Sequence, residues 1–207
     1  MFRAVANVRD EVLRRCGNGE ITLGHVTAAF KQVTAIDEIV YAPYDVPKTN
    51  PIIGQFSRYT KSPGVYVPSK TLVEIQYASH LDEAWRRMVV CKELCHALEA
   101  PEGVHSASNE GIDKLVEGFA LLSSASDLKD HLKDDGGALG LEFMAEFGAL
   151  EILFPLPRRK QLFEEGMTPD QTKIMGLAAA YKIPPVYVVT ALGKDYTRMT
   201  ELLMRAP

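Results

Sequence analysis

Apolar residues recur at helical spacing through most of the chain and follow a different pattern in one short part of it. Near the N-terminus, Val5, Val8 and Val12 are spaced by three or four positions, which predicts an amphipathic helix. Gly17 and Gly19 then mark its end. The same spacing predicts helices over residues 2–16, 22–35, 82–100, 108–125, 141–154, 158–165, 169–182 and 185–203.

The strand pattern follows the second predicted helix, where β-branched and aromatic residues stand between prolines. Ile-Val-Tyr at residues 39–41 predicts a short strand, and residues 52–67 predict a small antiparallel hairpin that turns at residues 61–64. Residues 72–78 are ambiguous between the two periods, and we expect a helix there. Residues 127–140 are polar and glycine-rich, which predicts a loop.

These elements predict an α+β fold that is mostly helical and contains one small antiparallel or mixed sheet. A chain of 207 residues is long enough to bury one core, so we expect a single domain over residues 1–207. Residues 155–207 are then a helical C-terminal extension of that domain.

The composition narrows the class of protein. A net charge of −4 does not favour general nucleic-acid binding, and no apolar stretch approaches the roughly 20 residues of a membrane helix. The first ten residues carry charges where a signal peptide needs an apolar segment. Three cysteines make a poor disulfide framework and fit a reducing compartment. We therefore expect a cytoplasmic protein.

Residues 91–96 read Cys-Lys-Glu-Leu-Cys-His, which is close to a zinc-peptidase motif. A His-Glu-x-x-His helix places two histidine ligands four residues apart on one face, with the glutamate between them as general base. Glu93 and His96 occupy the glutamate and second-histidine positions. Lys92 occupies the position of the first histidine.

Residues 65–68 and 86–98 resemble the strand and catalytic helix of the ImmA/IrrE family of bacterial and phage zinc metallopeptidases. Residues 142–155 resemble the second helix of that family, and residues 177–192 its closing helical pair. The resemblance covers about residues 25 to 195. It implies a small sheet beside a zincin-like pair of helices.

By this resemblance, Glu142 is the third metal ligand, with Glu146 as the fallback one turn later, and Glu93 activates the zinc-bound water. The chain departs from the family at Lys92, at Cys95, where glycine is usual, and in a longer connection between the two helices. The role of that insertion, residues 101–140, is not indicated by the sequence.

The lysine changes the expected chemistry. Only His96 and Glu142 remain as ligands, and an ammonium close by repels a divalent cation. A buried ammonium needs a partner, so we expect Lys92 to pair with Glu142 in place of zinc, with no metal bound. The alternative is a retained zinc whose third ligand is Cys91, Cys95, His80 or His105.

The motif residues also have plainer interpretations. Taken alone, His96 is more typical of a partly buried histidine than of a ligand, and Glu93 is typical of a surface residue or of a partner for an arginine. The two cysteines, four residues apart, are typical of small residues packed in a helix.

The resemblance predicts a metallopeptidase-like pseudoenzyme that serves as a regulatory, protein-binding module, with a transcriptional repressor as the expected partner. The alternative is an active zinc endopeptidase that cleaves such a repressor and uses a rearranged ligand set. A helix-turn-helix at residues 169–203 is a third hypothesis, which the apolar second helix (residues 186–192) disfavours.

Overall fold

The computed structural model describes residues 2–50, 52–62, 64, 68–98, 103–108 and 138–204. In chain order its elements are α1 (Phe2–Cys16), α2 (Leu23–Val33), β1 (Glu38–Tyr44), β2 (Ile52–Lys61), β3 (Lys70–Ala78), α3 (Glu83–His96), β4 (Gly103–Ser108), α6 (Ala138–Leu153), α7 (Leu156–Glu164), α8 (Gln171–Tyr181), α9 (Pro185–Leu192) and α10 (Lys194–Met204). The predicted α+β class is confirmed.

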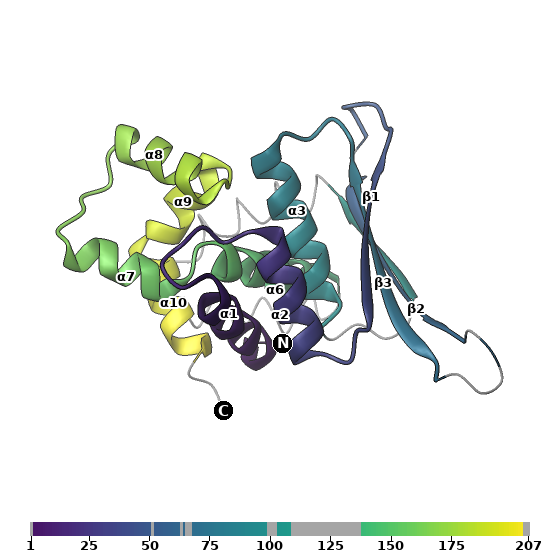
Figure 1. Ribbon diagram of the computed structural model, residues 1–207. Coiled ribbons are helices and arrows are strands. Elements are labelled where there is room, and N and C mark those ends of the chain that lie inside the picture. The colour runs from purple at the N-terminus through teal and green to yellow at the C-terminus, as the bar shows by residue number, and fades with distance from the viewer. Residues whose placement is uncertain are drawn as a thin grey trace.

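The four strands form one mixed sheet in the order β1-β3-β2-β4. β1 is parallel to β3, whereas β2 is antiparallel to both β3 and β4. Figure 1 shows the sheet at one side of the molecule, with α3 between it and α6, and the helices α7 to α10 farther from the sheet. α3 therefore lies in the middle of the protein.

The prediction of a helix at residues 72–78 was wrong, because these residues lie in β3, one of the two interior strands of the sheet. Val73 and Ile75 are fully buried, while Glu74 and Gln76 are only partly so. That period of two is the pattern of a strand. β3 is also the antiparallel partner of β2, so the hairpin predicted within residues 52–67 is made by β2 and β3 instead. Residues 65–67 lie outside the described residues.

The boundaries of α3 follow from its capping. Asp82 accepts a hydrogen bond from the backbone of Trp85 and begins the helix. The helix ends at His96 and not at the predicted Ala100, since Ala97 and Leu98 form a turn.

β4 was not predicted, because no element was expected at residues 103–107 and a helix was expected to begin at Ser108. The remainder of that predicted helix, and the loop up to residue 137, lie outside the described residues. α6 begins at Ala138, three residues before the predicted start.

The predicted last helix over residues 185–203 is two helices. Gly193 adopts an extended conformation between α9 and α10, and glycine stabilises helices poorly. The C-terminal helices are tied to the rest of the fold by fully buried Arg159, which donates to the carbonyl of Ala191 and to the carboxylate of Glu151. Arg9 of α1 lies 3.1 Å from the same carboxylate.

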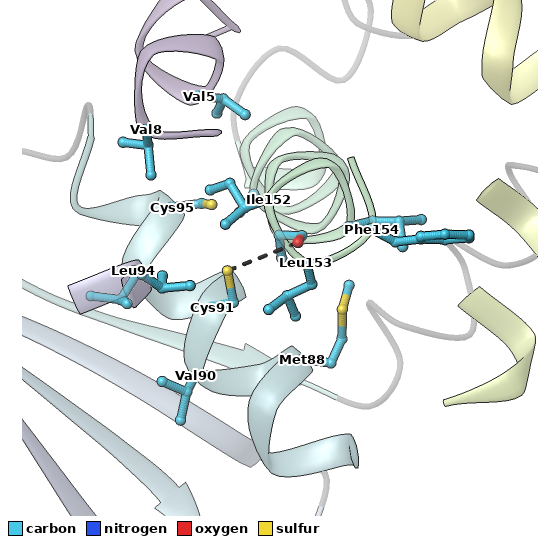
Figure 2. Packing of buried hydrophobic residues seen from close by; sticks show 14 of the residues in the cluster. Val5, Val8, Met88, Val90, Cys91, Leu94, Cys95, Ile152, Leu153 and Phe154 are labelled. Carbon is cyan, nitrogen blue, oxygen red and sulfur yellow. Dashed lines mark hydrogen bonds between the residues drawn. The ribbon is translucent and has the colours of Figure 1, made fainter. Parts of the chain in front are cut away.

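The core lies where α1, α3 and α6 meet. In Figure 2, Cys91 and Cys95 of α3 point toward α6, and Val5 and Val8 of α1 close the cluster. Gly148 permits this packing, because a Cβ there would lie 3.0 Å from the sulfur of Cys95.

Among the described residues, no single helix has the length and apolar character to cross a membrane. α8 and α9 taken together do satisfy those two criteria, but they are bent by 111° at the break between them.

Candidate functional site

The site lies on the stretch of α3 that is enclosed on all sides. Every residue from Arg87 to His96 is buried, because one side of α3 faces the sheet and another faces α6. Residues four apart on a helix share a face, so Lys92 and His96 project together toward the start of α6. Glu142 stands there, with 19% of its side chain exposed.

Lys92 and Glu142 form the expected ion pair. The Nζ of Lys92 donates to Oε2 of Glu142, and Nε2 of His96 lies 3.2 Å from Oε1 of the same carboxylate. Only 4% of the lysine side chain is exposed. One carboxylate of α6 thus contacts two residues of α3.

Glu93 points away from α6 and toward the sheet. Its side chain is fully buried against Gly54 of β2, where a Cβ would come within 2.9 Å of Oε1 and 2.5 Å of a methyl of Val89. Neither carboxylate oxygen has a hydrogen-bond partner among the described residues, and Lys92 Nζ is 3.8 Å from Oε1. Burial raises the pKa of Glu93 despite the nearby positive charge.

The charges of the ion pair are mutually stabilised. Burial opposes ionisation of Glu142, but the contact with His96 and the charge of Lys92 outweigh it and lower the pKa of Glu142 to about 2. Burial likewise disfavours the ammonium of Lys92, yet the carboxylates of Glu93 and Glu142 leave its pKa raised. At neutral pH the pair is an ammonium and a carboxylate.

Glu146, the fallback ligand, has a different role. Tyr187 of α9 donates a hydrogen bond to its Oε1, and Trp85 packs edge-on against the tyrosine ring at 5.9 Å. Burial raises the pKa of Glu146 to about 7, and its Oε2 has no hydrogen-bond partner among the described residues. Tyr187 was not predicted as part of the site, since it lies within an apolar helix and its hydroxyl has no signature in the sequence.

Phe56 and Gly54 of β2 also belong to the site and were not predicted. The Phe56 ring stacks on His96, with centroids 6.4 Å apart and an interplanar angle of 18°. No local pattern distinguishes these two residues from others in β2, because their roles depend on which part of α3 lies over the strand.

Three of the four candidate replacement ligands are not placed to complete the site. Cys91 and Cys95 lie against Ala149 and Gly148 in the apolar core, and burial raises the pKa of Cys95 well above its usual value, which disfavours a thiolate ligand. His80 precedes α3, whereas His96 is its last residue, about 20 Å away along a helix of this length.

His105 is the remaining candidate. The register of the sheet places it opposite Phe56 and so beside the strand position that contacts His96.

The described residues of this site do not fit a catalytic zinc. Such a zinc takes three protein ligands and a water, but here Lys92 and His96 contact the two oxygens of Glu142. Within the part of the chain that the structure describes, no three His, Cys, Asp or Glu side chains gather as a metal-binding group. What the cluster can do chemically is hold two helices together by charge.

Comparisons with models of known protein families, with curated proteins and with solved structures found no match for this chain. The resemblance to the ImmA/IrrE family therefore depends on the order and spacing of its motif residues.

Proposed function

We propose that this chain is a metallopeptidase-like protein with a degenerate zinc site, and that it acts as a regulatory, protein-binding module instead of a peptidase. The observation that supports this proposal is the ion pair between Lys92 and Glu142. An ammonium in the first ligand position supplies no lone pair and repels a divalent cation.

The ion pair also replaces the mechanical contribution of a metal. A structural or catalytic metal links the elements that carry its ligands. Lys92 and Glu142 link α3 to α6 by an ion pair. The two helices can therefore be held together in this chain without a metal.

The proposal extends to partner and compartment. The family resemblance points to a protein partner, with a transcriptional repressor as the first candidate, and to the cytoplasm. Nucleic acid is not the expected ligand: the exposed side chains of α9 include Val186 and Val189, where a recognition helix needs polar and basic groups.

Metal content tests the proposal. Protein purified without an affinity tag or chelators, incubated with zinc and desalted, is analysed by mass spectrometry for bound metal. Wild type is expected to retain far less than one zinc per chain. Lys92→His restores an imidazole four residues before His96 and is expected to retain close to one.

Lys92→Met is the matched control, because it removes the ammonium without adding a ligand. Zinc in Lys92→His but not in Lys92→Met shows that the histidine position decides metal binding. Near-stoichiometric zinc in the wild-type protein contradicts the proposal.

The second candidate function, an active zinc endopeptidase with a rearranged ligand set, is favoured by one observation, the register position of His105 opposite Phe56. Its prediction is distinct: wild-type protein holds zinc, His105→Ala loses it, and His80→Ala does not. Cleavage of a repressor by wild-type protein and not by Glu93→Gln would then establish the activity.

A further inference from the structure

β4 covers the outer edge of β2, the strand that contacts Glu93 and His96 of α3. It pairs antiparallel with β2 along the outer edge of that strand, from Arg58 opposite Gly103 to Ile52 opposite Ser108. An unpaired edge strand is a ready template for a further strand. β4 is therefore the segment of this chain that occupies that template.

The part of β2 that β4 covers is the part that contacts the site. Gly54 lies against Glu93, and its partner in β4 is Ala107. Phe56 stacks on His96, and its partner is His105. A strand on this edge consequently pairs with the stretch of β2 that contacts both motif residues of α3.

β4 is weakly specified as a strand. Its six residues, Gly-Val-His-Ser-Ala-Ser, include a single β-branched residue and no lysine, arginine or carboxylate, and glycine, alanine and serine are poor strand formers. The pairing is also irregular, with a register shift between Ile52 and Gly54.

We propose that β4 is a displaceable strand, and that an extended, uncharged segment of the protein partner replaces it on the edge of β2. The inference rests on the proposed binding function, because it assumes a protein partner. Strand addition supplies affinity through main-chain hydrogen bonds, and the peptide backbone of β4 shows that this edge accepts an extended chain of small residues.

The test uses the full chain and a fluorescent synthetic peptide with the sequence of residues 102–109, Glu-Gly-Val-His-Ser-Ala-Ser-Asn. His105→Pro and Ser106→Pro are compared by fluorescence anisotropy. Successive residues of a strand direct their N–H groups to opposite edges, so only one of these prolines removes a hydrogen bond to β2. That variant is expected to bind the peptide at least about tenfold more tightly than wild type.

The other proline variant is the matched control, since it carries the same residue with its missing N–H directed away from β2. Both variants are expected to keep the helical circular dichroism of wild type, because among the described elements β4 makes its extensive contacts with β2 and not with a helix. Equal peptide binding by wild type and both variants overturns the proposal, as does a loss of the helical signal when β4 is released.

A disulfide provides a second, independent measurement. Ser57 and Val104 are partners in the register, so Ser57→Cys with Val104→Cys, in a Cys16→Ser background, can hold β4 on β2. Added to the peptide-binding variant, the oxidised form is expected to lose peptide binding and the reduced form to recover it. Unchanged binding on oxidation contradicts displacement. Zinc content decides the proposed function and peptide binding decides the role of β4, so either can fail alone.

Discussion

Lys92 of α3 and Glu142 of α6 form an ion pair in the interior face between the two helices, and His96 contacts the second oxygen of the same carboxylate. The two partners are not equivalent. The lysine side chain is 4% exposed and the glutamate side chain 19%, so the ammonium depends more on its partner than the carboxylate does.

This asymmetry predicts unequal effects of removing either partner. Glu142→Ala removes the hydrogen-bonded partner of a buried ammonium and leaves Glu93 and Glu146 as its nearby carboxylates. We expect it to lower the free energy of unfolding by about 3 kcal/mol. Lys92→Met keeps the side-chain volume and leaves a carboxylate that has water and His96 as partners, so a loss of about 1 kcal/mol is expected. Urea denaturation at pH 7 measures both.

The double variant Lys92→Met with Glu142→Ala is the control. If the cost of Glu142→Ala comes from an unpaired ammonium, the double variant is more stable than Glu142→Ala alone. A double variant that is less stable than either single variant would show that the two side chains contribute by packing and not by charge.

The raised pKa of Glu146 leads us to expect that the protein loses stability as the pH rises. Its pKa is raised from 4.5 to about 7, so its protonated form stabilises the fold fully below pH 4.5, and this contribution disappears as the pH rises through 7. Glu146→Gln remains neutral and still accepts a hydrogen bond from Tyr187. Relative to wild type, its free energy of unfolding is expected to increase by about 3 kcal/mol between pH 4.5 and pH 8.

Glu142→Gln is the matched comparison with the opposite sign. The pKa of Glu142 is lowered from 4.5 to about 2, so its carboxylate contributes stability above pH 4.5 that is lost as the pH falls toward 2. In urea denaturation, the stability of Glu146→Gln should differ from that of wild type increasingly as the pH rises toward 7. The stability of Glu142→Gln should differ from that of wild type above pH 4.5 and approach it as the pH falls toward 2. Parallel curves for wild type and Glu146→Gln would contradict the assignment for Glu146.

Gly54→Ala tests how closely α3 packs on β2. A methyl group there would meet Val89 at 2.5 Å and Glu93 at 2.9 Å, distances that force the helix or the strand to move. We expect a destabilisation of about 1–3 kcal/mol. In Gly176→Ala on α8, no atom lies within 4 Å of the added methyl, and a gain of about 0.5–1 kcal/mol is expected from helix propensity. Thermal denaturation measures both variants. Equal changes in their melting temperatures would contradict the close approach of α3 to β2.

Of the substitutions considered, we expect Glu151→Ala to cause the largest loss in the free energy of unfolding. Its carboxylate and Arg159 are both fully buried, and Arg9 shares the same carboxylate. Glu151→Ala leaves a buried guanidinium uncompensated, at a cost of about 3–5 kcal/mol. Arg14→Ala is the control, because the ion pair of Arg14 with Glu11 lies within α1 at the surface. We expect the control to unfold at the wild-type urea concentration, and a small effect of Glu151→Ala would show that the network is dispensable.

The helices were predicted where one face is consistently apolar. α1 has its predicted limits, and α2 begins one residue after the predicted start because Thr22 is its N-cap. The wrong predictions of secondary structure lie where the local spacing of apolar residues does not match the element that forms in the folded protein. Residues 72–78 were predicted as a helix because their apolar residues do not alternate strictly, and the adjacent Leu72 and Val73 are both buried in β3. The helix expected over residues 185–203 is interrupted at Gly193.

Within the site, the ion pair was predicted from the sequence because a buried ammonium without a partner is energetically unfavourable. Lys92 lies on the same helix face as the apolar residues Met88 and Val89, so we expected its side chain to be buried. A buried ammonium requires a carboxylate partner. The family resemblance supplied Glu142 as that carboxylate. The same reasoning could not supply Tyr187, Gly54 or Phe56, because each acts through an element whose position relative to α3 is not encoded locally.

The amino-acid sequence by itself determined the helical periodicity, the capping residues and the spacing that puts Lys92 and His96 on one face, since these depend on neighbours within a few positions. Only the tertiary structure decided that Glu93 is sealed against β2, that Glu146 bonds Tyr187, and that β4 covers the sheet edge beside the site. Those contacts join residues far apart in the chain, and their energies depend on burial and on partners that exist once the helices and the sheet have packed.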